Sequence, residues 1–546
     1  MVQLCRSADN LHKRLYILLL CANILTLLLC TVYLATAPLH VWWNALGVLL
    51  LLTLLGNIVA AITPSPHSWI DYLYLLATAG FFVAIPLLNR AASINISHLS
   101  SRSTLTVVLL FSLLFLGLIV TFMKLHKRAS YSEKAIPDSL TVKGITILLT
   151  ITIFIGVYAS VHLIIGKSAG IIEMTFPQYA VFFSLVYLAL TGLLLKMHRN
   201  RKSSFFYKSV LIGGVWSASV FLIPLAVTPF WLVDAEETYT QSFEITSEPL
   251  ISLEAKSQTM MNIPFSLPDY FFGKRSGEYR VIENIPYYEG TTGPDKGIKL
   301  KFDAYLPPEG KTDLPGKQSV LIRIHGGGWT AGDKGSSNNP QVNKYFASQG
   351  FVVFDVQYGL SHEEKLFSFS QVPENIVAGF SIDDMVRHIG IFTDYLAKHH
   401  QEYGANLNSV FVSGASAGGQ LANAAGLGAN GVHDFINPSL HVKGIISVYP
   451  ANGLAPYLEI EGTKELTDPA RLISEKSPPA LVFQGTHDGL VPPFVAQAFD
   501  QTYKQYNLQS ALLLAPFGGH ACVSYFPGYY NQTFLYYMER FLYQFQ

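Results

Sequence analysis

Seven long apolar runs in the first 233 residues constrain the fold of this chain more than any other feature. Each run approaches the roughly 20 residues that an α-helix needs to cross a bilayer. The runs are Leu15–Leu34, Val41–Ala61, Trp69–Leu88, Thr104–Met123, Ile145–Ile165, Phe176–Leu195 and Val210–Leu232. Half of the chain is hydrophobic and only 14% is charged, which is typical of a protein that lies partly in lipid. We therefore predict an all-α transmembrane bundle of about seven helices over residues 1–233.

Basic residues are distributed unevenly between the segments that join these runs. If the N-terminus is cytoplasmic, the outer loops hold only Arg90, Arg102 and Lys167, whereas the inner segments hold 13 basic residues. The 13 are Arg6, Lys13, Arg14, Lys124, Lys127, Arg128, Lys134, Lys143, Lys196, Arg199, Arg201, Lys202 and Lys208. This asymmetry follows the positive-inside rule. An odd number of spans then places residues 234–546, with 21 basic and 32 acidic side chains, on the non-cytoplasmic side.

Few polar side chains interrupt the apolar runs. His162, Asn23 and Asn57 are the main ones, and we interpret each as a helix-to-helix hydrogen bond rather than as part of a relay. Asp71, near the start of the third run, makes that span the least regular. One helix would anchor a soluble domain, so seven require another reason. Two hypotheses remain open: the bundle docks a lipid-borne substrate, or it is a scaffold for other membrane proteins.

In the second half of the chain, Val412–Gly419 joins a β-branched run to the pattern Gly-x-Ser-x-Gly, with Ser416 at its centre. The two glycines suit a turn too tight for a Cβ at either position. We therefore predict that Ser416 lies in a strained strand-to-helix turn with its hydroxyl exposed as a nucleophile. An ordinary glycine-rich loop is the alternative for this motif taken alone.

A second glycine-rich turn, His325-Gly326-Gly327-Gly328-Trp329, follows the apolar run Ser319–Ile324. Glycines at the end of a strand leave backbone N–H groups exposed. We predict that the amides of Gly326 and Gly327, with that of Ala417, form an oxyanion hole. Two such turns, each after an apolar strand, favour a functional site over coincidence.

A serine nucleophile needs a histidine base and a carboxylate that holds the histidine in the right tautomer. Asp488 follows the strand-like residues 479–484, and His520 follows the strand-like residues 511–516. The order Ser416, Asp488, His520 along the chain is that of an α/β-hydrolase. The alternatives are an ordinary turn aspartate and a surface-loop histidine.

From about Tyr279 to the C-terminus the chain resembles an α/β-hydrolase esterase of the hormone-sensitive-lipase type. His325–Trp329 followed by Gly332-Asp333-Lys334 is similar to the subgroup of kynurenine formamidases, isoprenylcysteine methylesterases and feruloyl or acetylxylan esterases. The resemblance implies a carboxylic ester hydrolase whose mostly parallel sheet has helices on both faces. Ala415 departs from the pattern, because many relatives carry an acidic residue or a histidine before the serine. The substrate therefore stays open.

The remaining patterns fit this fold. We predict a linker or N-terminal extension over residues 234–277 and the hydrolase domain over residues 278–546. Two long segments, 360–380 and 450–478, are candidate caps over the substrate pocket or plain structural excursions. The expected elements are an antiparallel hairpin (Tyr279–Tyr287 and Ile298–Tyr305), interior strands (Phe351–Val356 and Val442–Val448) and a crossover helix (Ile382–Tyr403).

The prediction is a membrane-anchored serine ester hydrolase that acts on a small-molecule or lipid-borne ester. An acyltransferase with the same triad and an inactive scaffold are the alternatives. No cofactor, metal or nucleic-acid motif is found. Cys522 is the one cysteine beyond residue 233, and we interpret it as a buried apolar side chain. The lack of a disulfide pair there favours a bacterial periplasm, whereas Asn95-Ile96-Ser97 and Asn531-Gln532-Thr533 keep a lumenal or extracellular location open.

Overall fold

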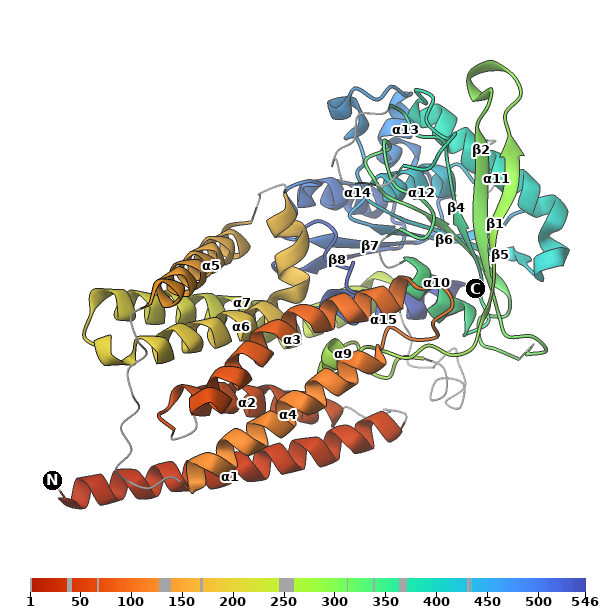
Figure 1. Cartoon of the computed structure of the whole chain (residues 1–546). Helices are drawn as coiled ribbons and strands as arrows, with labels where there is room; N and C mark the ends of the chain where they lie inside the picture. Colours follow the sequence, from red (N-terminus) through yellow and green to blue (C-terminus); the bar gives the residue numbers. More distant parts are fainter. Residues whose placement is uncertain are drawn as a thin grey trace.

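The computed structural model describes all of the chain except residues 1, 37–41, 66–67, 127–138, 167–169, 245–259, 312, 337–338, 363–369, 371, 430–432 and 434. Its N-terminal half contains seven helices that are long and apolar enough to cross a membrane (Figure 1). They are α1 (Val2–Ala35), α2 (Trp43–Ile62), α3 (Ser68–Ile94), α4 (Thr104–Leu125), α5 (Leu140–Ile165), α6 (Ile171–Met197) and α7 (Phe205–Ser242). All seven predicted spans are confirmed as helices.

Helix α7 continues ten residues beyond the predicted span, into the segment expected to be a linker. Ala235 and Tyr239 are buried there, four residues apart and so on one face of the helix. That face packs on the C-terminal helix α15 (Tyr529–Phe545), where the Tyr239 hydroxyl lies 3.4 Å from Gln544 Oε1. A second short helix, α9 (Leu267–Phe272), also lies within residues 234–277.

The ends of α2, α3, α4 and α6 that lie far from the sheet meet in a buried cluster of charged side chains. Asp71 Oδ2 accepts hydrogen bonds from Lys124 Nζ and Lys196 Nζ, each at 2.9 Å. Both ammonium groups also donate to the Thr63 carbonyl, at the C-terminal end of α2 where the helix dipole favours positive charge. The charges lie at the ends of the predicted apolar runs: Lys124 and Lys196 directly follow the fourth and sixth runs, and Asp71 is the irregularity near the start of the third. Two of the 13 inner basic residues are buried in this network. The inner segments then hold 11 other basic residues, compared with three in the outer loops, so the asymmetry remains.

This cluster makes Asp71 important for stability. Asp71→Asn leaves two buried ammonium groups without a carboxylate, and we expect it to lower the free energy of unfolding by about 3–5 kcal/mol. Denaturant titration of the full chain in detergent micelles measures this change. Glu237→Gln, on the exposed side of α7, is the matched control and should change stability by less than about 0.5 kcal/mol. Equal stability of both variants would show that the ion pairs contribute nothing.

The three polar residues predicted inside the spans behave differently from one another. Asn23 and Asn57 exchange two side-chain hydrogen bonds of 2.8 Å between α1 and α2, as predicted. The His162 ring instead contacts Tyr158 of its own helix, with ring centroids 4.4 Å apart, so the predicted helix-to-helix bond of His162 is not found within the described residues. Lys127, Arg128, Lys134 and Lys167, which entered the charge count, lie outside the described residues.

The C-terminal half is built on one eight-stranded sheet with strand order β1-β2-β4-β3-β5-β6-β7-β8. The β1–β2 and β2–β4 pairs are antiparallel and the other pairs are parallel. The strands are β1 (Arg280–Glu289), β2 (Lys299–Leu306), β3 (Ser319–Ile324), β4 (Val352–Val356), β5 (Asn406–Ala415), β6 (Val442–Val448), β7 (Ala480–Gly485) and β8 (Ser510–Ala515). This order, with a nucleophile turn after β5, is the α/β-hydrolase fold, and the predicted hairpin and interior strands are confirmed.

Helices cover both faces of the sheet, as predicted. Alternate residues of each strand point to opposite faces, so Val320 and Ile322 pack on one side and Leu321 on the other. The helices are α10 (Asn339–Ala347) and α15 on the Leu321 side, and α11 (Ile382–Tyr403), α12 (Ala417–Leu427) and α14 (Pro493–Gln505) on the other side. The segment 450–478 contains only short helical turns, including α13 (Lys464–Thr467).

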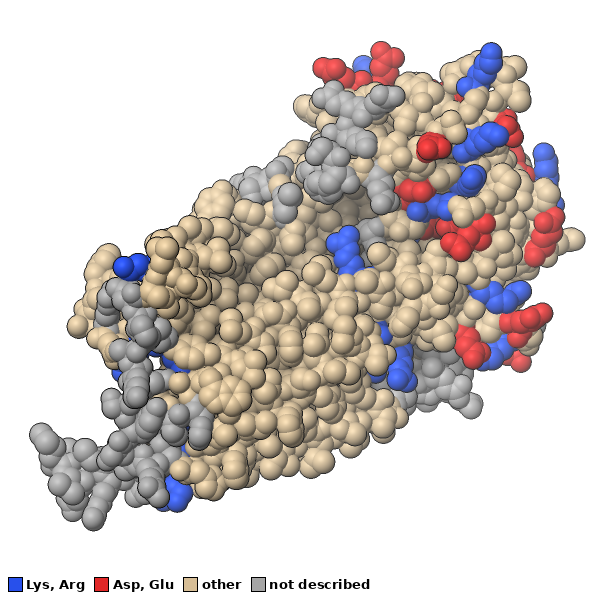
Figure 2. Space-filling model, viewed as in Figure 1, with Lys and Arg blue, Asp and Glu red and all other residues tan. Residues whose placement is uncertain are grey.

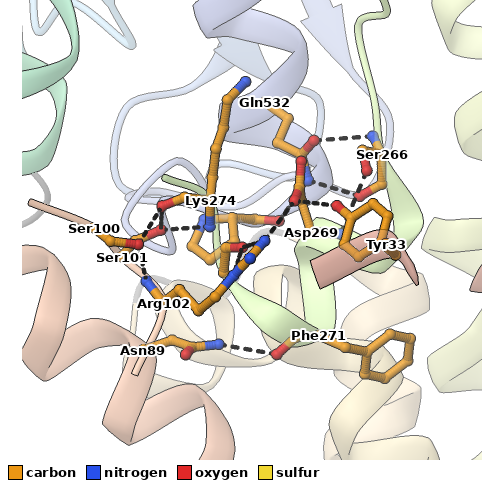
Figure 3. A network of polar contacts seen from close by, with 12 residues as sticks. Tyr33, Asn89, Ser100, Ser101, Arg102, Ser266, Asp269, Phe271, Lys274 and Gln532 are labelled. Carbon is orange, nitrogen blue, oxygen red and sulfur yellow. Dashed lines mark hydrogen bonds and ion pairs between the residues drawn. The ribbon is translucent and has the colours of Figure 1, made fainter. Parts of the chain in front are cut away.

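The bundle and the hydrolase share one hydrophobic core. Buried residues of α10 and α15 form a continuous cluster with residues of α1 to α7. Polar contacts also join the two parts at the α9 segment (Figure 3). Asp269 of α9 accepts a hydrogen bond from Tyr33 of α1, and Arg102 approaches the same carboxylate at 3.7 Å. The bundle therefore has an extensive contact with the hydrolase rather than a flexible tether.

Exposed charged side chains are concentrated on the hydrolase half of the molecule. Figure 2 shows them over the hydrolase end and almost none across the middle of the bundle. The helix ends that contact the hydrolase are those at the predicted outer side, such as the end of α1 and the beginning of α6.

The asparagines of the two glycosylation triplets differ in exposure to solvent. Asn95 is exposed. Asn531 is only 2% exposed and donates to the Phe526 carbonyl, so a sugar has no room there.

Candidate active site

Ser416 lies in the turn between β5 and α12 with φ of 58° and ψ of −123°. This backbone is strained for a residue with a side chain, and such strain is concentrated at functional sites. The turn leaves no space beside it: a Cβ on Gly414 would collide with the Gly418 carbonyl, and one on Gly418 would collide with the Ile324 carbonyl. The two glycines of the motif are therefore required by close backbone contact, as the sequence predicted.

Ser416, His520 and Asp488 lie in one hydrogen-bonded row. Ser416 Oγ is 3.0 Å from His520 Nε2, and His520 Nδ1 is 2.9 Å from Asp488 Oδ2. The three residues come from the ends of β5, β7 and β8, which the parallel sheet brings to the same edge. His520 is 5% exposed, while Ser416 is half-buried and therefore accessible to a ligand.

The Asp488 carboxylate is held by four donors and is buried. Its Oδ1 accepts from the backbone amides of Leu490, at 3.0 Å, and Val491, at 2.8 Å. Its Oδ2 faces His520 Nδ1 and Gln484 Nε2. The backbone bonds fix the direction of the carboxylate, so that Oδ2 remains aimed at the imidazole.

The residues predicted to form the oxyanion hole lie in two turns that contact each other beside the serine. Gly326 lies against the nucleophile turn, because a Cβ on it would lie 2.7 Å from the Ala415 carbonyl and 3.3 Å from Ser416 Cβ. Gly327 adopts φ of 132°, which only glycine tolerates readily. Among the described residues, none accepts a hydrogen bond from the N–H of Gly326, Gly327 or Ala417. These donors are thus available to a ligand.

Buried side chains hold the glycine turn in place. The His325 ring stacks on Tyr358 with centroids 4.4 Å apart, and the Tyr358 hydroxyl donates to the His325 carbonyl at 3.0 Å. Burial lowers the pKa of His325, so the ring is neutral. Trp329 Nε1 donates to Gln420 Oε1 at 2.9 Å, which ties this turn to α12.

Glu173, at the beginning of the membrane helix α6, also belongs to this site. Its Oε1 accepts hydrogen bonds from the backbone amides of His520, at 3.1 Å, and Gly489, at 2.7 Å. This residue is not among those predicted from the sequence. The one available signal was an acidic side chain directly before an apolar run, which a sequence cannot distinguish from a solvated helix end.

Cys522, two residues after His520, is 1% exposed, and burial raises its pKa well above the usual value for a thiol. The interpretation of Cys522 as a buried apolar side chain is confirmed. Within the described residues there is no group of three side chains suited to a metal ion.

Comparison with known proteins gives two curated relatives, each matched over part of this chain. The chain is 25% identical over 241 residues to the probable carboxylic ester hydrolase LipM of Mycobacterium tuberculosis, covering 38% of this chain and 50% of LipM. It is 24% identical over 241 residues to esterase LipQ of the same organism, covering 40% of this chain and 51% of LipQ. The chain thus spans about half the length of these curated relatives.

Solved structures similar to this part include the native esterase 2 of Thermogutta terrifontis. It is 22% identical, with a TM-score of 0.37, and the match covers 48% of this chain and 90% of the esterase. A truncated carbohydrate esterase from gut microbiota is 17% identical, with a TM-score of 0.34, and the match covers 48% of this chain and 96% of that structure. Residues 302–503, which hold the serine, the aspartate and the glycine turn, match the BD-FAE family model.

Proposed function

We propose that this chain is a membrane-embedded serine hydrolase that cleaves carboxylic esters through an acyl-enzyme intermediate. The observation that carries the proposal is the row Ser416 Oγ, His520 Nε2 and Nδ1, Asp488 Oδ2, with distances of 3.0 and 2.9 Å. The similarity to carboxylic ester hydrolases supports an ester as the substrate class.

In the proposed mechanism His520 Nε2 takes the proton of Ser416 as Oγ attacks the ester carbonyl carbon. Negative charge collects on the carbonyl oxygen, where the amides of Gly326, Gly327 and Ala417 stabilise it. The intermediate collapses, His520 gives the proton to the leaving alkoxide, and the alcohol departs. Water then attacks the acyl-serine while His520 takes its proton; the bond from the acyl carbon to Ser416 Oγ breaks, His520 returns the proton to Oγ, and the carboxylic acid departs. Asp488 orients the imidazole and stabilises its charged form.

We further propose that the hydrolase acts on the non-cytoplasmic side. The helix ends that contact the hydrolase belong to the poorly basic side of the bundle, while Lys124 and Lys196 lie at the opposite ends. Glu173, near the beginning of a membrane-spanning helix, bonds the amide of His520 directly, so the site lies close to the membrane surface. This position favours an ester carried by a membrane lipid over a freely diffusing one.

Sealed membrane vesicles of both orientations, prepared from cells that express the full chain, test this function. We expect right-side-out vesicles to hydrolyse a charged, membrane-impermeant acyl ester, and inside-out vesicles to do so only after detergent is added. The matched amide should be cleaved far more slowly. Vesicles with Ser416→Ala supply the background rate. Preference for the amide would contradict the reaction class, and activity confined to intact inside-out vesicles would contradict the orientation.

A further inference from the structure

We propose that Glu173 of helix α6 is a positioning residue that holds two loops of the hydrolase in register: the acid loop after β7 (residues 486–491), which carries Asp488, and the base loop after β8 (residues 516–521), which carries His520. The inference rests on the proposed function, since it concerns the geometry of that same triad. It also gives the bundle a task beyond anchoring, because a side chain of a membrane-spanning helix then becomes part of the catalytic support.

A single oxygen of Glu173 joins the two loops. Its Oε1 accepts from the amide of His520 itself and from the amide of Gly489, the residue after Asp488. The backbone of His520 and that of the residue after Asp488 therefore share one acceptor, which ties the two loops together. The hydrolase supplies further links between these loops, such as the bond of 2.9 Å from His487 N to Gly518 O, but none of these involves the backbone of His520.

Close packing fixes α6 against the base loop. A Cβ on Gly519, the residue before His520, would collide with both Cγ and the carbonyl oxygen of Glu173. Helix α5 adds a contact on the acid loop, where His487 Nε2 lies 3.1 Å from the Ile164 carbonyl. Helix α6 therefore reaches the loops after both β7 and β8, and α5 reaches the loop after β7; both helices lie beside this edge of the sheet (Figure 1).

Stability alone accounts poorly for this side chain. Glu173 is only 6% exposed, and its Oε2 has no hydrogen-bond partner among the described residues. Burying a carboxylate with one oxygen unsatisfied is costly. The bonds made by Oε1 offer a reason to retain it, because they act on the two loops on which catalysis depends.

Three substitutions in the full chain separate a hydrogen-bonding role from charge and from packing. Glu173→Gln keeps an acceptor oxygen at the same reach but removes the charge. Glu173→Leu keeps the approximate size without an acceptor. Glu173→Asp keeps the charge, but its side chain is one methylene shorter, so the oxygen is withdrawn from the two amides.

We expect Glu173→Leu and Glu173→Asp to lower kcat about 10²-fold with little change in KM, since misplacement of catalytic groups by about 1 Å has that effect. Glu173→Gln should stay within about threefold of the wild type, because both backbone bonds persist. Tyr239→Phe is the matched control: it removes a bundle-to-hydrolase contact at Gln544 and should leave kcat unchanged.

Full activity of Glu173→Leu would overturn the proposal, as would an inactive Glu173→Gln beside an active Glu173→Asp, which would assign the effect to charge. If Glu173→Leu does not fold, the kcat of Glu173→Gln compared with that of Glu173→Asp tests the proposal. An inactive wild type would instead contradict the proposed function, and the two failures are thereby distinguishable.

Discussion

Replacing Ser416 with alanine should abolish ester hydrolysis, with kcat reduced about 10⁶-fold, as expected when the nucleophile of a serine hydrolase is removed. The hydroxyl is the one group in the site that can form the acyl bond, and no other described residue approaches His520 Nε2 as a hydroxyl donor. The measurement is the steady-state rate of ester hydrolysis by the purified full chain in detergent.

The fold should survive this substitution. Alanine and serine both carry a Cβ, so the strained backbone at φ of 58° is equally costly for either residue. The variant loses only the hydrogen bond of Oγ to His520, so its unfolding temperature should stay close to that of the wild type. A variant that keeps a substantial part of the wild-type rate would show that another group is the nucleophile.

Replacing Asp488 with asparagine should lower kcat about 10⁴-fold while the substrate still binds. The backbone amides of Leu490 and Val491 both donate to Oδ1, so the amide oxygen of asparagine should occupy that position. The NH₂ group then faces His520 Nδ1 and donates to it. The proton of the neutral imidazole moves to Nε2, which can no longer accept the proton of Ser416.

Asp500→Asn provides a matched control for this prediction. Asp500 is also a buried aspartate of the hydrolase, but it bonds Lys504 and Ser510, remote from the triad. The kcat of the Asp500→Asn variant should equal that of the wild type. If Asp488→Asn and Asp500→Asn lose activity equally, the effect of Asp488 is one of stability and not of imidazole orientation.

The sequence predicted the parts of this molecule that depend on local pattern. Apolar runs predicted the seven spans, because a bilayer imposes one minimum length on every helix that crosses it. Glycine turns after apolar strands led to Ser416, Gly326 and Gly327, since a parallel sheet brings the ends of its strands to one edge. The same reasoning selected Asp488 and His520, which the structure brings within hydrogen-bond distance of each other.

The contacts between the two halves could not be predicted in this way. Glu173 is 347 residues from His520 along the chain, and nothing in its neighbourhood indicates that partner. Asp71 was recognised as an irregularity in an apolar run, but its lysine partners were counted as flanking charges of other helices. Asn531 fits a modification triplet, whereas burial in α15 excludes it. Each case depends on long-range packing, which local periodicity does not contain.

Together these contacts change the interpretation of the membrane bundle. It shares a hydrophobic core with the hydrolase, and its helix α6 reaches the backbone of His520, the proposed base. Helices α5 and α6 therefore belong to the framework of the proposed site. The isolated C-terminal half would lack both Glu173 and α7. Every test above therefore uses the full chain.

The most direct test of this account is to treat the full chain with a fluorophosphonate and to locate the adduct by peptide mass spectrometry. We predict a single covalent adduct on Ser416, formed by the folded protein and prevented by prior denaturation. Absence of any adduct on folded wild-type protein, or an adduct on a different residue with Ser416 unmodified, would contradict the central claim that this serine is the activated nucleophile.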